Sequence, residues 1–115
     1  MSRNQELLLD GIHCCQNLVS FTAGMNYEDF CLDLKTQNAV FFAFINLNEA
    51  FSRLPADFRD QCSNIPFDEI RGLRNRIVHQ YDDIALDIVW ETIQRDIPML
   101  LQQLEVLFEE LRVEE

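Results

Sequence analysis

Three polar side chains suited to phosphate chemistry lie within six positions of one another, at Arg74, Asn75 and His79. An imidazole titrates near neutral pH, so His79 could take a proton from a hydroxyl group. The guanidinium of Arg74 keeps its charge and could hold a phosphate as negative charge builds up on it. Asn75 could orient His79 or the phosphate. These groups would suit cleavage of RNA, whose 2′-hydroxyl is a nucleophile that DNA lacks, and this chemistry needs no metal ion.

A helix from about Pro66 to Gln80 must position these side chains. At 100° per residue, one side of it carries a stripe that we expect to be buried. This stripe consists of Phe67, Ile70, Leu73, Ile77 and Tyr81. Asn75 and His79, four positions apart, stack on the opposite side together with Asp68 and Gly72, and Arg74 lies at the boundary. The sequence therefore predicts that an imidazole, an amide and a guanidinium lie close together on one polar face.

Gly72 is unfavourable inside this helix, by about 1 kcal/mol relative to alanine. One reason to keep a glycine there is the close approach of another helix. If a second copy of the helix packed across Gly72, two such polar faces would line one cleft, which predicts a symmetric dimer. A simpler interpretation also stays open, because arginine and histidine near a helix end often form only a solvated face that interacts with the helix dipole.

The remaining sequence predicts an all-α fold, an antiparallel four-helix bundle with one or two short extra helical turns. Apolar residues recur at helical spacing, and glycine and proline number only three each. The main helices are expected at about 4–21, 36–54, 66–80 and 86–111, with short turns at 27–34, 56–62 and 81–83. Gly24 should end the first helix, Thr36 should cap the second, and Pro98 should kink the last. A single domain, residues 1–115, accounts for the whole length.

Charge and cysteine content limit the possible functions. The formal net charge of −11 argues against non-specific nucleic-acid binding, although Arg71, Arg74 and Arg76 form one local basic cluster. The sequence has no signal-peptide layout and no apolar run long enough for a membrane helix, which predicts a cytoplasmic protein without membrane contact. The four cysteines form no CxxC pair and are expected to be reduced, mostly buried thiols. We therefore predict no metal and no cofactor.

The order of short motifs resembles the HepT-like toxins of the HEPN superfamily. Arg74, His79 and Tyr81 match the R-x4-H-x-Y motif of that family. Further similar segments are Asp-Leu-Lys-Thr-Gln-Asn-Ala-Val at 33–40, Glu-Ala at 49–50, Ile-Pro-Phe at 65–67 leading to the block at 74–79, and Leu-Asp-Ile-Val-Trp-Glu-Thr at 86–92. Each motif is weak alone, but their order and spacing cover nearly the whole chain.

The resemblance implies a homodimeric helical bundle that acts as an RNase toxin in a type VII-like toxin–antitoxin system. In that family the motif arginine and histidine, here Arg74 and His79, meet across the dimer. The partner is a minimal nucleotidyltransferase antitoxin, MntA, which silences the toxin by adding AMP to the motif tyrosine, here Tyr81. The chain departs from the family at Gln80, where glycine is common, and at the apolar residues Phe42 and Ile45.

Two alternatives to catalysis remain from the sequence. The acidic charge would suit a catalytically weak or inactive HEPN module that dimerises and binds a nucleotidyltransferase partner without cutting RNA. A nucleotide-binding or wholly structural bundle is the third interpretation. A neighbouring gene for a small nucleotidyltransferase would support the first two interpretations and count against the third.

Overall fold

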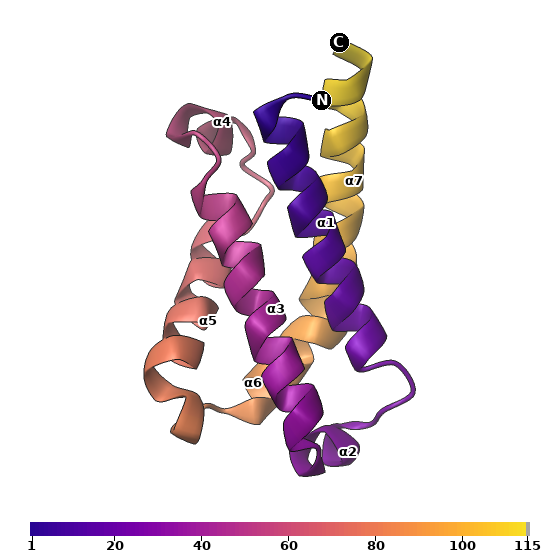
Figure 1. The fold of residues 1–115 in the computed structure, drawn as a ribbon, viewed down its shortest axis with the longest axis vertical. Helices are drawn as coiled ribbons and strands as arrows, with labels where there is room; N and C mark the ends of the chain where they lie inside the picture. Colours follow the sequence, from indigo (N-terminus) through magenta and orange to yellow (C-terminus); the bar gives the residue numbers. More distant parts are fainter. Residues whose placement is uncertain (115) are drawn as a thin grey trace.

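The computed structural model describes residues 1–114, and every regular element in that range is helical (Figure 1). A 3-10 turn, η1 (Tyr81–Asp83), and a π-helical turn, η2 (Thr92–Asp96), join some of the α-helices. The α-helices are α1 (Arg3–Phe21), α2 (Tyr27–Leu32), α3 (Leu34–Ser52), α4 (Ala56–Gln61), α5 (Phe67–Gln80), α6 (Leu86–Glu91) and α7 (Ile97–Glu114).

The long helices form an antiparallel bundle. In Figure 1, α1 and α5 run downward, while α3 and the continuous path from α6 to α7 run upward. Helix α1 packs against α3 and α7, and α3 also packs against α5, so α5 lies at an edge of the bundle. The predicted all-α four-helix bundle is confirmed, and α2 and α4 are the predicted short extra turns. None of the helices within residues 1–114 combines the length and apolar character needed to cross a membrane.

The core is built largely on α3. An apolar stripe at helical spacing runs along this helix, continues to Leu54 just past its end and is buried throughout; its members are Val40, Phe44, Leu47, Phe51 and Leu54. Phe42 is 66% exposed, because it points away from that stripe. In α1, Leu8, Ile12, Cys15 and Leu18 recur at helical spacing and are buried, whereas Val19 is 40% exposed. Val19 lies about 100° around the helix from Leu18 and turns partly away from the core.

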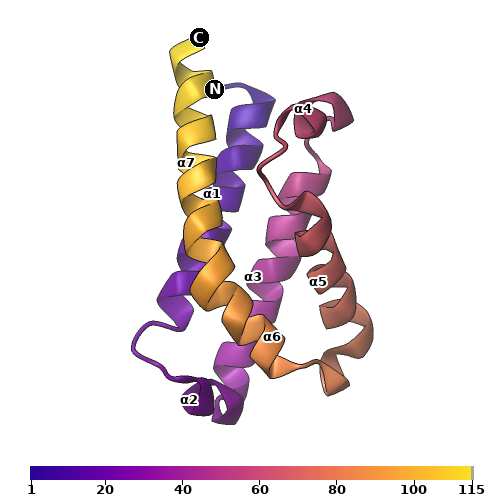
Figure 2. The same ribbon diagram turned by 180° about the vertical axis from the view of Figure 1, so that it is seen from behind.

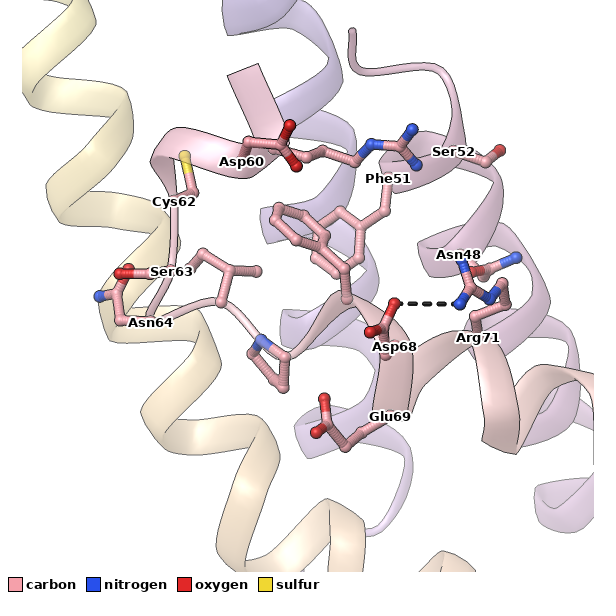
Figure 3. Close-up of a pocket in the computed structure, with 14 residues that line it drawn as sticks. Asn48, Phe51, Ser52, Asp60, Cys62, Ser63, Asn64, Asp68, Glu69 and Arg71 are labelled. Carbon is pink, nitrogen blue, oxygen red and sulfur yellow. Dashed lines mark hydrogen bonds and ion pairs between the residues drawn. The ribbon is translucent and has the colours of Figure 1, made fainter. Parts of the chain in front are cut away.

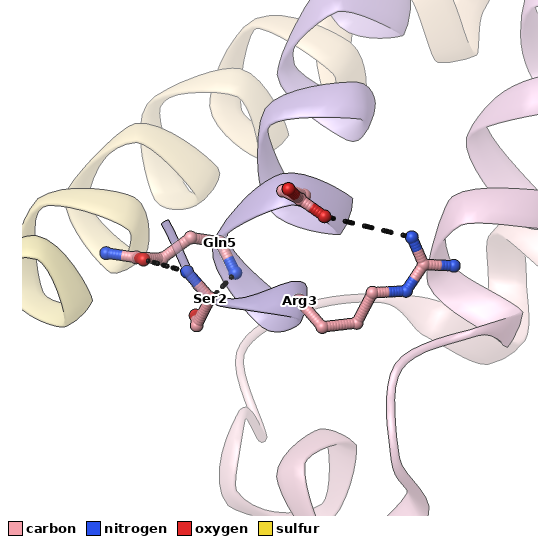
Figure 4. A network of polar contacts seen from close by, with 4 residues as sticks. Ser2, Arg3 and Gln5 are labelled. Carbon is pink, nitrogen blue, oxygen red and sulfur yellow. Dashed lines mark hydrogen bonds and ion pairs between the residues drawn. The ribbon is translucent and has the colours of Figure 1, made fainter.

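Helix starts are fixed by side chains that satisfy free backbone N–H groups. At α1, the Ser2 N–H donates to Gln5 Oε1 at 2.7 Å and the Gln5 N–H donates to Ser2 Oγ at 3.2 Å (Figure 4). The predicted cap of the second helix was wrong by three residues. Asp33 is the cap, and its Oδ1 accepts the Thr36 N–H at 3.0 Å. The Asp33 carboxylate is a stronger hydrogen-bond acceptor than the Thr36 hydroxyl. The helix therefore begins about one turn earlier than predicted.

Two other predicted features, the end of the first helix near Gly24 and the irregularity of the last helix near Pro98, agree with the structure. Helix α1 stops at Phe21, and Gly24 follows with φ of +79°, a left-handed conformation that glycine adopts readily. The last helix is interrupted before Pro98, where the Ile97 N–H bonds to the Thr92 carbonyl five residues back. Proline lacks an N–H and its ring crowds the preceding turn, so the helix widens there. The path from α6 through this turn into α7 is visible in Figure 2.

Candidate active site

Helix α5 is anchored by one apolar side and is open on the other. Ile70, Leu73 and Ile77 are at most 4% exposed. At its start, the ring of Phe67 packs edge to face on Phe51 of α3, with centroids 5.0 Å apart. Such a pair adds to the apolar burial that holds the helix in place. The remaining sides of α5 can therefore carry polar residues on a rigid support.

The structure brings Arg74 and Asn75 together. Arg74 Nη1 donates a hydrogen bond of 3.1 Å to Asn75 Oδ1. Arg74 is half-buried, as its expected position at the boundary requires, whereas Asn75 is exposed. The amide is neutral, so the contact orients the guanidinium without cancelling its charge, and an arginine has further N–H donors left for a phosphate.

His79 is not brought to Arg74 within one protomer. The His79 side chain is exposed and one turn beyond Asn75 on the same face. His79 lies five positions after Arg74, which corresponds to about 140° around the helix axis. The prediction that all three groups lie close together therefore holds for Arg74 and Asn75, while the imidazole and the guanidinium diverge.

Tyr81 does not continue the buried stripe of α5, so that prediction was wrong. The residue is 62% exposed and begins the turn η1. The cause is local, because the backbone at Gln80 leaves the helical region with φ of −137° and ψ of 26°. Its aromatic ring and hydroxyl lie on the surface just past His79.

Gly72 lies on an open surface. A Cβ built at this position would have no atom outside the helix within 4 Å. No helix of the same chain therefore approaches it within residues 1–114, and packing of a second copy across it stays a prediction. At Gly11, by contrast, a Cβ would lie 3.3 Å from Cε1 of the Phe51 ring, so that glycine does serve a close helix contact.

A polar hollow of about 700 Å³ opens beside the first turn of α5, between the end of α3 and the segment after α4 (Figure 3). Within it, Arg71 Nη2 lies 3.0 Å from Asp68 Oδ1. This ion pair is exposed, so it contributes little stability. The Asp68 carboxylate nevertheless partly neutralises the charge of Arg71. Of the predicted basic cluster, Arg76 lines a separate hollow with Asp96 and Met99 on the other side of α5. The three arginines thus point in different directions.

The cysteines do not form a reactive centre. Burial is the main cause that raises the pKa of Cys14 to about 11 and that of Cys15 to about 12. Both are therefore protonated thiols at neutral pH. Burial also raises the pKa of Cys62. Within residues 1–114, no three His, Cys, Asp or Glu side chains are grouped as metal ligands would be.

Two apolar side chains, one on α5 and one on the helix that supports it, are exposed, and the sequence did not single out Val78. Val78, one turn after Arg74 on α5, is 40% exposed, and Phe42 on the adjacent helix α3 is 66% exposed. Both sit in apolar runs, where the pattern alone cannot tell which member turns outward. Around the axis of α5, Val78 lies between Arg74 and Asn75, so it adds an apolar side chain to the outer face of this helix.

The fold and this site define a small helical bundle with an arginine–histidine pair on one edge helix. The family model described as Ribonuclease HepT-like matches residues 12–107, so the chain belongs to this family. It is 32% identical over 104 residues to “Probable ribonuclease HepT” of Thermococcus cleftensis, covering 90% of this chain and 94% of that protein. It is 33% identical over 95 residues to a protein named “Putative RNase” from Caldanaerobacter subterraneus subsp. tengcongensis, covering 83% and 85%. No solved structure matches the chain.

Proposed function

We propose that this protein is a metal-independent endoribonuclease whose catalytic residues are Arg74, Asn75 and His79. The observation that carries the proposal is the half-buried Arg74 and the exposed His79 on the edge helix of a HepT-like bundle. Helix α5 has three arginines against two acidic residues, so its local charge is positive on a chain of net charge −11. A local positive site can hold a phosphate even on an acidic protein.

In the proposed reaction, a neutral His79 accepts the proton of an RNA 2′-hydroxyl. The 2′-oxygen attacks the adjacent phosphorus, and the bond from phosphorus to the 5′-oxygen breaks. The leaving 5′-oxygen takes up a proton from water and His79 returns its proton to the solvent, so the products are a 2′,3′-cyclic phosphate and a 5′-hydroxyl. Arg74 stabilises the charge on the phosphate oxygens in the transition state, and Asn75 holds the guanidinium in position.

The site that we propose is shared between two copies of the chain. Because Arg74 and His79 diverge by about 140° around α5, one phosphate is reached more readily by the arginine of one protomer and the histidine of the other. Gly72 is open to a second helix, and the exposed Phe42 and Val78 provide apolar area for a homodimer contact.

We further propose that the protein is the toxin of a toxin–antitoxin pair, silenced by transfer of AMP to Tyr81. An MntA-like nucleotidyltransferase antitoxin would make this modification. The hydroxyl of an exposed tyrosine is available to such an enzyme. An AMP group two residues from His79 would be bulky and anionic, so it would exclude RNA and repel its phosphates.

The direct test is cleavage of an RNA oligonucleotide by purified protein in the presence of EDTA. We expect fragments ending in a cyclic phosphate from wild type, and at least a hundredfold less from His79→Ala and Arg74→Ala. Gln80→Ala, next to His79 and equally exposed, is the matched control and should cut normally. A substrate with a single 2′-deoxy position should resist cleavage there. Equal activity of His79→Ala and wild type would reject this site.

The acidic net charge favours one second candidate, a dimeric HEPN module that binds its partner but does not cut RNA. Intact RNA from a folded, unmodified wild-type dimer would select this alternative. Co-expression with the nucleotidyltransferase, followed by intact mass measurement, then tests AMP transfer separately. A gain of one AMP in wild type but not in Tyr81→Phe would support the modification under either candidate.

A further inference from the structure

The outer face of α7 carries apolar side chains that the bundle does not use. Met99, Val106 and Val113 recur every seven residues and are 61%, 55% and 79% exposed. The opposite face of the same helix is committed to the core, where Ile97, Leu100 and Leu104 are at most 1% exposed. A seven-residue repeat returns to nearly the same side of a helix, so the three side chains form one line, here called the outer stripe.

The outer stripe is bordered by glutamates. At 100° per residue, Glu109 lies on one side of Val106, and Glu110 and Glu114 lie on the other. Together with Val106 and Val113, these glutamates line a shallow groove of about 610 Å³. Arg112 is the one basic residue in this part of α7, and its Nη2 lies 3.0 Å from Glu109 Oε2. The border of the stripe around Val106 and Val113 is therefore strongly negative.

Within residues 1–114, no element covers the stripe at Val106 and Val113, whereas Met99 lies at its near end beside a hollow that Arg76 of α5 also lines. Helix α7 packs against α1 and η2 on its inner side. In Figure 2 it lies on the viewer's side of the bundle with no helix in front of it. The groove is separate from α5 and its proposed catalytic residues, so the inference does not rest on the proposed function.

Charge decides which occupant fits the groove. Two copies of the stripe would place glutamates opposite glutamates on chains of net charge −11, which disfavours pairing of this face with itself. Nucleic acids and anionic membrane surfaces are repelled for the same reason. A basic helix with one apolar side satisfies both the stripe and its glutamate border. The stripe spans 14 residues, or about 21 Å, so a helix of about 15 residues would cover it.

We propose that the outer stripe and its glutamate border form a docking surface for a basic amphipathic helix of a different protein. Apolar anchors of that helix pack on Met99, Val106 and Val113, and its lysines or arginines pair with Glu109, Glu110 and Glu114. This is the helix-in-groove mode of recognition, in which apolar anchors supply affinity and charged flanks select the partner and its orientation.

The test uses an 18-residue peptide of leucine, alanine and lysine, with leucines on one helical side. Isotope-labelled full-length protein is titrated while amide NMR shifts are recorded, and affinity is measured by fluorescence anisotropy. We expect shifts along the outer face of α7. Val106→Ser should weaken binding about tenfold, since it removes a buried apolar contact. The double variant Glu109→Gln/Glu110→Gln should weaken binding and reduce its salt dependence.

Matched controls distinguish binding at this surface from non-specific electrostatic attraction between a basic peptide and an acidic protein. Leu32→Ser removes an apolar side chain that is 88% exposed on α2, and Glu28→Gln/Glu91→Gln removes two exposed charges outside α7. Both control variants should bind the peptide like wild type. Equal binding of a scrambled peptide of the same composition, or shifts located away from α7, would overturn the proposal. So would a wild-type dimer that becomes monomeric with Val106→Ser, because a second copy would then occupy the groove.

Discussion

Arg74 and Asn75 are neighbours in sequence, and the Arg74 guanidinium donates to the Asn75 amide oxygen at 3.1 Å. Neighbouring residues on a helix point about 100° apart, so this contact forms only because the arginine is long enough to bend toward the amide. The result is a guanidinium fixed on the surface of α5 by a neutral partner. In the proposed site, the identity of residue 75 should therefore control how much positive charge Arg74 offers to a phosphate.

This relationship predicts different effects of two substitutions at Asn75. Asn75→Ala removes the orienting contact and should lower single-turnover RNA cleavage by about threefold to tenfold, as expected for one lost hydrogen bond. Asn75→Asp places a carboxylate against Arg74 that competes with the substrate phosphate, so cleavage should fall by about a hundredfold. Equal losses for the two variants would show that the charge of Arg74 is not what Asn75 regulates.

The 140° divergence of Arg74 and His79 predicts complementation between inactive variants. Arg74→Ala and His79→Ala proteins are unfolded together, refolded as a mixture, and assayed for RNA cleavage. If each site combines residues from two protomers, half of the dimers are mixed and each carries one complete site. About a quarter of wild-type activity should therefore return. A mixture as inactive as its components would place both residues of a site on one protomer.

The fold was predictable because its signals are local and repeated. The stripe of α3 from Val40 to Leu54 marks the buried side of the central helix at every turn, and all of it is buried. Choices between adjacent apolar residues were not predictable. Val19 beside Leu18 and Phe42 beside Phe41 are equivalent in the sequence, and only packing against other helices decides which one turns outward.

The places of the candidate residues on α5 were predictable, but the geometry between them was not. Spacing alone placed Asn75 and His79 on one side of a helix and Arg74 at its border, as the structure shows. The exposure of Tyr81 was missed because the helical pattern was continued one residue too far. The backbone departs from the helix at Gln80, and such an end depends on the following turn rather than on the periodicity of the helix.

Asp33 predicts a pH dependence of stability. Hydrogen bonds from the Thr36 backbone N–H and hydroxyl lower the pKa of this carboxyl below its ordinary value of 3.8. A carboxyl with a lowered pKa in the folded state stabilises the protein above its unfolded pKa. That contribution disappears as the pH falls through the pKa that Asp33 has in the folded protein. Asp33→Ala should therefore melt below wild type at pH 7, and the difference should shrink below about pH 3.8.

Asp33→Asn is the matched control for this prediction. The amide oxygen still caps α3, but the side chain does not titrate. Its melting temperature should lie between those of wild type and Asp33→Ala at pH 7, and it should approach that of wild type in acid. A difference between wild type and Asp33→Ala that stays constant from pH 7 to pH 3 would contradict a role for the ionised cap.

Gly72 and Gly11 predict opposite effects of the same substitution. Gly72→Ala meets open space and should raise the free energy of unfolding of the isolated protomer by about 0.4–1 kcal/mol, since alanine favours the helix. The added Cβ of Gly11→Ala would lie 3.3 Å from the buried Phe51 ring. This substitution should lower the free energy of unfolding, because a tightly packed core can move little to make room. Urea unfolding at low protein concentration measures both.

If a second copy packs across Gly72, as the proposed active site requires, Gly72→Ala should also weaken the dimer in sedimentation and reduce RNA cleavage while the fold becomes more stable. A variant that is both more stable and fully active would remove Gly72 from the dimer contact.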